Sequence, residues 1–66
     1  MTIDDAAAFI AECAWGMGAD PQRVKDDPVR AVHQAVKRHH PDRGGDGDRL
    51  RRILEARDVL VRDRTR

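Results

Sequence analysis

The 66-residue sequence predicts an all-α fold: a small bundle in which one helix packs across an antiparallel helix hairpin. In three segments, apolar residues recur every three or four positions, which is the period of an amphipathic helix. Each segment is bounded by residues typical of helix ends. A stretch with three glycines in seven residues separates the last two segments and predicts a loop. The length allows a single domain over residues 1–66.

The first helix is expected over about residues 3–17. Thr2 is a suitable N-cap, and acidic residues follow it in the first turn, where they interact favourably with the helix dipole. Gly16 and Gly18 are expected to end the helix. The apolar stripe of this segment consists of Ile3, Ala6, Phe9, Ile10, Cys13 and Met17. The chain has one cysteine and cannot form an internal disulfide, so this thiol is expected to act as a small buried hydrophobe.

The second long helix is expected over about residues 28–39. Before it, Asp20-Pro21 can begin one short helical turn with Val24 directed inward. Asp27-Pro28 is a clear start signal, because it combines an N-cap with a proline at the first helical position. The helix must end before Pro41, since a residue that precedes proline disfavours the helical conformation. The inner stripe of the helix consists of Val32, Ala35, Val36 and His39.

The third long helix is expected over about residues 48–62, with Asp48 or Asp46 as its N-cap. Its inner stripe consists of Leu50, Ile53, Ala56 or Arg57, and Leu60. Residues 62–66 are expected to form a frayed basic tail. Because a short loop joins the second and third helices, we expect them to form an antiparallel hairpin.

Composition excludes several classes of function. No apolar run approaches the roughly 20 residues that a membrane span needs, and the N-terminus lacks the basic region of a secretory signal. The free thiol fits a reducing compartment, so we expect a cytoplasmic protein without a membrane partner. A chain of this length leaves almost no room for an enclosed pocket, so we do not expect an enzyme.

The two halves of the chain differ in charge. Residues 1–27 carry six acids and two bases, whereas residues 28–66 carry eleven bases and six acids. A positive C-terminal half suggests an acidic partner, either a protein surface or nucleic acid. The same charges can also do no more than solvate two helices, and composition alone leaves both interpretations open.

The most informative stretch is residues 37–46, where a basic helix ends in His-Pro-Asp and a glycine-rich loop follows. Pro41 ends the helix and rigidifies the turn. His40 lies at the negative end of the helix dipole, which favours its protonated form. Asp42 is free to pair with a cation, and Arg43 adds a base beside it. These residues form either an exposed recognition turn or an ordinary helix stop in which the aspartate bonds its own backbone.

With its context, His40-Pro41-Asp42 resembles the motif of the J-domain, the Hsp70-activating module of the DnaJ (Hsp40) co-chaperones. Met17-Gly18 stand 23 positions before His40, where the family has a Leu-Gly pair. Ala31 falls at a small-residue position of the family. The string Ile53-Leu54-Glu55-Ala56-Arg57-Asp58-Val59-Leu60 is similar to the family pattern Ile-x-Glu-Ala-x-x-Val-Leu. The resemblance covers about residues 12–61 and fits a J-domain-only type with a short glycine-rich loop.

The resemblance implies an Hsp70/DnaK-type partner whose ATP hydrolysis the chain stimulates. Asp42 would engage an arginine of the Hsp70, while His40 and Pro41 would set the loop. The residues that would make electrostatic contacts are Arg30, Lys37, Arg38 and Arg43. The resemblance implies no catalytic residue and no cofactor. No metal is expected either, because the three histidines have no cysteine pair beside them and a structural zinc needs four ligands.

The chain departs from the family on its second helix, where Val29, His33 and Gln34 stand at positions that are basic in many J-domains. Two alternatives therefore stay open. The chain can be a J-like docking or assembly scaffold without Hsp70 activation, or a small basic nucleic-acid-binding three-helix module. Acids interleave the arginines of the third helix and the net charge is only +1, so nucleic acid is the less favoured partner. A further protein partner can contact the first helix or the basic C-terminal half.

Overall fold

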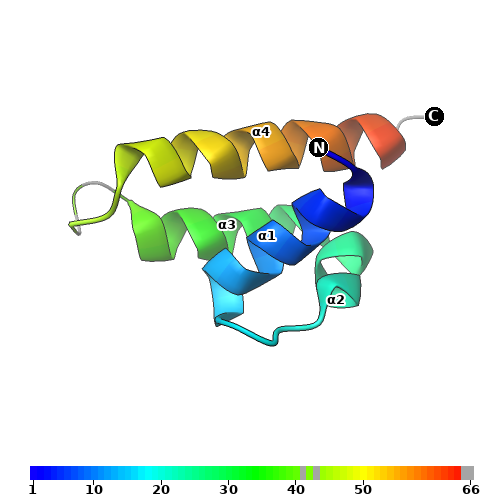
Figure 1. Ribbon diagram of the computed structural model, residues 1–66, viewed down its shortest axis with the longest axis horizontal. Coiled ribbons are helices and arrows are strands. Elements are labelled where there is room, and N and C mark those ends of the chain that lie inside the picture. The colour runs from blue at the N-terminus through cyan, green and yellow to red at the C-terminus, as the bar shows by residue number, and fades with distance from the viewer. Residues whose placement is uncertain (41, 43, 65–66) are drawn as a thin grey trace.

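A computed structural model of the chain describes residues 1–40, 42 and 44–64. These residues form the predicted all-helical fold. The helices are α1 (Ile3–Trp15), α2 (Pro21–Asp26), α3 (Pro28–His39) and α4 (Gly47–Arg64). The long helices α3 and α4 lie side by side and run in opposite directions, α1 packs across both, and α2 packs against α1 and α3 (Figure 1). This arrangement leaves the described residues of the α3–α4 connection, 40, 42 and 44–46, at one end of the molecule.

Side-chain caps fix where the helices begin. Oxygens of Thr2, Asp20 and Asp27 each accept a hydrogen bond from a backbone N–H two or three residues further on, at 3.1, 2.9 and 3.2 Å. Each cap satisfies one of the N–H groups that have no partner within the helix. At the start of α4, Asp46 Oδ1 accepts from the backbone N–H of Asp48 at 2.9 Å. Asp46, and not Asp48, is therefore the N-cap of α4.

The end of α1 corrects one prediction. The last helical residue is Trp15, two residues before the expected end. Gly16 has a φ of 102°, a conformation that favours glycine, and its N–H donates to the carbonyl of Glu12 at 2.8 Å. Because the chain leaves the helix here, Met17 is not part of the apolar stripe. Its side chain is 90% exposed, so its expected place in the core is wrong.

Helix α4 is longer than expected at both ends. It begins at Gly47 and continues through Arg64, so the first residues of the tail expected to fray over 62–66 are helical. Residues 65–66 lie outside the described residues. Despite its 18 residues, α4 alternates apolar and charged side chains. Within the described part of the chain, no helix has both the length and the apolarity required to cross a membrane.

The core is built largely from alanine. Among the described residues, the hydrophobic core contains thirteen buried side chains, and seven of them are alanines, which let the helices approach closely but contribute little apolar surface each. Val24 is fully buried, as predicted, and anchors α2. Cys13 is 2% exposed, and burial raises the pKa of its thiol, although nearby Arg49 opposes the shift. The thiol is therefore a buried hydrophobe, as expected from its place on the stripe. The other large fully buried side chains are Ile10 and Ile53.

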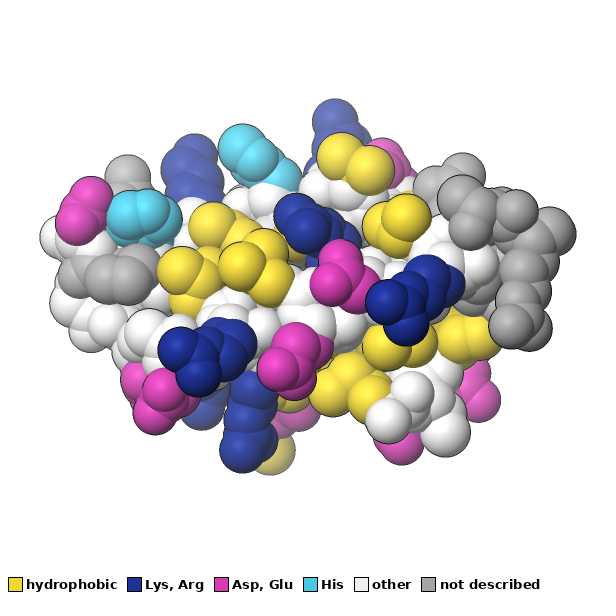
Figure 2. Space-filling model, turned by 90° about the horizontal axis from the view of Figure 1, so that it is seen from above, with side chains coloured by type: hydrophobic (Ala, Val, Ile, Leu, Met, Phe, Trp, Pro, Cys, Tyr) yellow, Lys and Arg dark blue, Asp and Glu magenta, His cyan; other side chains and the backbone are white. Residues whose placement is uncertain are grey.

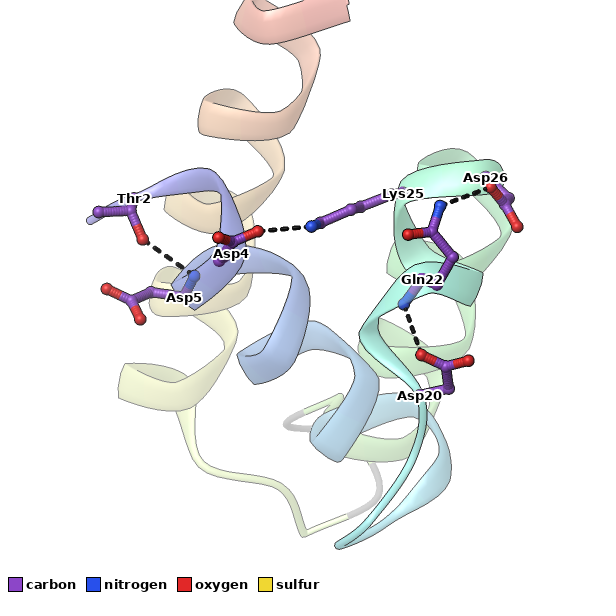
Figure 3. A network of polar contacts seen from close by, with 7 residues as sticks. All are labelled: Thr2, Asp4, Asp5, Asp20, Gln22, Lys25 and Asp26. Atoms are coloured by element: carbon purple, nitrogen blue, oxygen red, sulfur yellow. Dashed lines mark hydrogen bonds and ion pairs between the residues drawn. The ribbon is translucent and has the colours of Figure 1, made fainter.

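Polar contacts on the surface join α2 to α1. Lys25 Nζ donates a hydrogen bond to Asp4 Oδ1, which holds the pKa of the Asp4 carboxyl below its ordinary value (Figure 3). Elsewhere on α2, the guanidinium of Arg23 lies 4.3 Å from the ring centroid of Trp15, a cation–π arrangement. Both contacts are exposed to solvent, so they orient the short helix more than they stabilise it.

Candidate partner-binding site

The α3–α4 connection projects from one end of the molecule, at the left of Figure 1. Helix α3 ends at His39, and His40 turns into an extended conformation with φ −64° and ψ 134°. That conformation is expected of a residue before proline. Asp42 follows with its side chain 90% exposed. The carboxylate is accessible to a partner, whereas Pro41 and Arg43, two of the predicted site residues, lie outside the described residues.

Two contacts join His40 to Asp42. The backbone N–H of Asp42 donates to His40 Nδ1 at 3.2 Å, and the same ring nitrogen lies 3.6 Å from Asp42 Oδ2. Nδ1 accepts the hydrogen bond from the backbone N–H of Asp42 in the tautomer in which it carries no proton. The His40 ring therefore holds the backbone of Asp42 close to the end of α3.

The second half of the connection folds back onto α3. The N–H of Gly45 donates to the carbonyl of His40 at 3.1 Å. A Cβ added at Gly45 would stand 2.1 Å from the carbonyl oxygen of His39, far inside contact distance. A Cβ added at Gly47 would meet nothing within 4 Å. Gly45 is therefore the glycine whose missing side chain lets the turn close.

Two consecutive side chains tie the end of α3 to the end of α1. Arg38 Nη1 donates to the carbonyl of Ala14 at 3.1 Å, and His39 Nε2 lies 3.2 Å from the carbonyl of Cys13. Both carbonyls belong to the last turn of α1, where C=O groups have no partner within the helix. The two side chains cap α1 and at the same time fix the end of α3, from which the connection leaves.

The predicted basic contact residues fall into two groups. Arg30 and Lys37 are exposed on α3 and lie seven residues apart, which places them on the same side of the helix. Arg38 has a structural role as well, because its guanidinium caps α1. The structure therefore brings three exposed cations, one of which also caps α1, and the carboxylate of Asp42 to α3 and the turn that follows it.

Two residues that shape the site, His39 and Gly45, were not among the predicted site residues. His39 had a signal, because it lies on the inner stripe of α3 and a half-buried histidine needs a polar partner. Gly45 is one of three glycines in its loop, and the sequence does not indicate which of them approaches a backbone. Among the described residues, no group of His, Cys, Asp or Glu side chains could hold a metal ion.

In comparisons with known proteins, no family model, no curated protein and no solved structure matches the chain. The proposed function therefore rests on the residues of α3 and on the geometry of the His40–Asp42 turn.

Proposed function

We propose that the chain is a co-chaperone module of J-domain type, which binds an Hsp70/DnaK-type chaperone and stimulates its ATP hydrolysis. One observation carries the proposal: Asp42 is 90% exposed at the turn after basic helix α3, with its backbone N–H bonded to His40. An acid held in place outside the fold suits an arginine of another protein. The ion pair can form with charge-assisted hydrogen bonds and with little ordering of the turn upon binding.

Helix α3 supports the encounter with such a partner. Arg30 and Lys37 present two exposed cations on one side of the helix, and the connection with Asp42 begins directly beyond its end. Cations in this position attract an acidic surface over a Debye length and speed association. Binding should therefore weaken as the salt concentration rises.

The chain contributes binding energy and no reacting group. A bound module can change the activity of its partner only if it binds the active state more tightly than the resting state. A tenfold stimulation requires a difference of about 1.4 kcal/mol. A hydrogen bond to a charged group contributes about 1.5–3 kcal/mol, so one well-placed contact between Asp42 and an arginine of the Hsp70 is sufficient.

The contacts between α3 and α1 fix the position from which the α3–α4 connection starts. Arg38 and His39 contact the carbonyls of Ala14 and Cys13, so the last turn of α3 is held against a second helix. Without these contacts, the end of α3 could fray and the carboxylate would sample many positions. In the proposed activity, Arg38 and His39 are positioning residues.

The test is single-turnover ATP hydrolysis by a bacterial DnaK-type Hsp70, with and without the chain. We expect the wild-type chain to raise the rate constant and Asp42→Asn to reduce the stimulation by about 10–100-fold, as expected for a lost charge-assisted contact. Asp46→Asn is the matched control. It makes the same charge change in the same connection, and asparagine caps a helix as well as aspartate does, so stimulation should be retained.

Two results would contradict the proposal. If the wild-type chain leaves the hydrolysis rate unchanged, the chain is not an activator and the docking scaffold becomes the better hypothesis. If Asp42→Asn and Asp46→Asn stimulate equally, Asp42 is not the group that acts on the Hsp70. Circular dichroism melts of both variants would show that each one is folded.

A further inference from the structure

A second surface of the hairpin, on the face that α1 does not cover, is an apolar groove. The groove has a volume of about 480 Å³, and its lining comes from α3 and α4 alone. Its aliphatic walls consist of Val29, Val32 and Val36 on α3, and Leu54 and Val61 on α4. Val29, Leu54 and Val61 are 73%, 38% and 44% exposed. Figure 2, which looks onto the molecule from above, shows hydrophobic side chains interspersed with His and with charged side chains of both signs.

The spacing of the wall residues is that of a helix-packing seam. On α3 the three valines follow one another at intervals of three and four residues, and on α4 Leu54, Arg57 and Val61 do the same. Such a pattern places side chains in one stripe along a helix and is the pattern by which one helix receives another. The small buried residues of α3, Ala31 and Ala35, form its core face. Of the three valines, Val32 is buried in the core, Val36 is half-buried against it and Val29 is exposed, so only the outer part of this stripe is uncovered in the described structure.

The charged side chains that line the groove and the hollow beside it are cations, Arg57 in the groove and Lys37 in the hollow, among the described residues. An adjoining hollow of about 320 Å³ shares His33 and Val36 with it and extends to Lys37 and His40. Arg57 lines the groove from α4, and none of the described Asp or Glu residues lines either hollow. The guanidinium of Arg57 pairs with Asp58 at 3.4 Å, but both side chains are about half exposed. An exposed pair of this kind contributes little and can be exchanged for a partner's carboxylate.

We propose that this groove binds an amphipathic helix of another protein, with an apolar stripe flanked by Asp and Glu. The walls are helices whose backbone groups are bonded internally, so they offer no edge to which a strand could pair. The helical spacing of both walls matches the stripe of a third helix, and the cations at the rim select acidic flanks. This binding uses side chains other than Asp42 and does not depend on the proposed Hsp70 activation.

A second copy of the chain is a poor occupant. Helices α1 and α4 have acidic residues in their first turns, but the apolar stripe of α1, including Ile10 and Cys13, is already buried in the core, and α4 is itself a wall of the groove. Two copies that met groove to groove would bring Lys37 and Arg57 of one against the same cations of the other. Like charges brought together across an interface oppose association.

The test uses a fluorescently labelled, helix-stabilised peptide of about four helical turns, with leucines at i, i+3 and i+7 and glutamates on both flanks. A matched peptide carries lysines in place of the glutamates. By fluorescence anisotropy with the full chain, we expect the acidic peptide to bind at least about tenfold more tightly than the basic one. Leu54→Glu should weaken binding of the acidic peptide by about tenfold or more, because it puts a carboxylate on the apolar wall.

Met17→Glu is the matched control, since it adds the same charge at a side chain that is 90% exposed outside the groove, and it should leave binding unchanged. Val61→Glu provides a second groove variant, and circular dichroism establishes that each variant is folded. Absence of binding, equal binding of the two peptides, or equal loss in Leu54→Glu and Met17→Glu would overturn the proposal. Self-association in sedimentation that Leu54→Glu abolishes would assign the groove to a second copy and would overturn it too. The assay contains no Hsp70, so its outcome is independent of the ATPase test.

Discussion

The molecule has two glycine-containing connections that are built differently. In the α1–α2 connection, residues 16–20, Gly16 and Gly18 have positive φ, and a Cβ at either position would meet nothing within 4 Å. Met17 between them is 90% exposed. In the α3–α4 connection, Gly45 lies against the backbone of α3. The first connection uses glycine for conformational freedom alone, whereas the second uses it for conformational freedom at Gly44, with φ 80°, and for close approach at Gly45.

This difference shows which connection can present a functional group in a fixed position. The α1–α2 connection reverses the chain without fixing the side chain at its tip. The α3–α4 connection is bonded to its own helix through Gly45 and His40, and His40 also contacts Asp42. The C-terminal end of α1 is capped by two side chains of α3, Arg38 and His39. Because the same two contacts hold the end of α3, the end of α1 helps to fix the position of the candidate site.

The largest expected effect is the loss of activation in His40→Gln. A glutamine cannot reproduce the ring contacts to the backbone and carboxylate of Asp42, so we expect stimulation of Hsp70 ATP hydrolysis to fall by about tenfold or more. Met17→Ser, at the tip of the α1–α2 connection, should keep full stimulation. Single-turnover hydrolysis measures both variants. An equal loss in the two would remove the distinction between the connections.

The next effect separates the two uses of glycine. Gly45→Ala places a Cβ 2.1 Å from the His39 carbonyl oxygen, so the turn must move, and we expect a cost of about 1–3 kcal/mol together with reduced stimulation. Gly18→Ala, at a φ of 85°, should cost about 1–2 kcal/mol through backbone strain and leave stimulation intact. Urea denaturation gives the stability, and the hydrolysis assay gives the activity.

Gly47→Ala is the control for this pair. Its Cβ would lie in open space within α4, so the variant should be more stable than the wild type by about 0.4–1 kcal/mol, with unchanged stimulation. If Gly45→Ala proved as stable and as active as Gly47→Ala, the close approach at the α3–α4 connection would have no consequence.

A smaller effect tests the tie between the helices. Arg38→Ala removes the donor to the Ala14 carbonyl, and we expect a loss of about 1 kcal/mol in the free energy of unfolding. Lys37→Ala, at the neighbouring exposed position, should change it by less than about 0.5 kcal/mol. Thermal or urea unfolding measures both. Equal stabilities would show that the guanidinium does not hold α1 to α3.

Much of the fold could be predicted from the sequence, because helix starts depend on local chemistry. Asp27-Pro28 marks the first residue of α3, and Thr2 caps α1 as expected. The end of α1 could not be placed as well, since the apolar period includes Met17 while the backbone has already left the helix. The apolar period continues past Gly16 to Met17, whereas helix α1 ends at Trp15.

The contacts that organise the candidate site could not be predicted, because they join distant parts of the chain. Arg38 and His39 reach carbonyls 24 and 26 residues away. A basic residue at the end of a helix suggests a solvated charge or a partner contact equally well. The groove escaped prediction for a related reason: Val32 and Val36 belong to the core stripe of α3, and the sequence does not indicate that Val29 stays exposed beside them.

The smallest effect lies near the α1–α2 connection, in the pair Asp4–Lys25. The hydrogen bond from Lys25 holds the pKa of Asp4 below its ordinary value. A carboxyl whose pKa is lower in the folded state stabilises the fold above its unfolded pKa, near about pH 4, and the contribution is lost as pH falls through the folded pKa. Lys25→Met should return the pKa of Asp4 to its ordinary range, and Lys25→Arg should keep it low. Carboxyl NMR titration measures the pKa, and equal values in Lys25→Met and the wild type would contradict the contact.

The most direct measurement is the footprint of an ATP-bound Hsp70 on the ¹⁵N-labelled full chain by NMR. We predict that amide signals shift or broaden along the exposed cationic side of α3 and at residues 40–46, while signals of residues 16–20 stay in place. Changes concentrated at residues 16–20, or no change at saturating Hsp70, would contradict the assignment of the α3–α4 connection as the partner-binding turn.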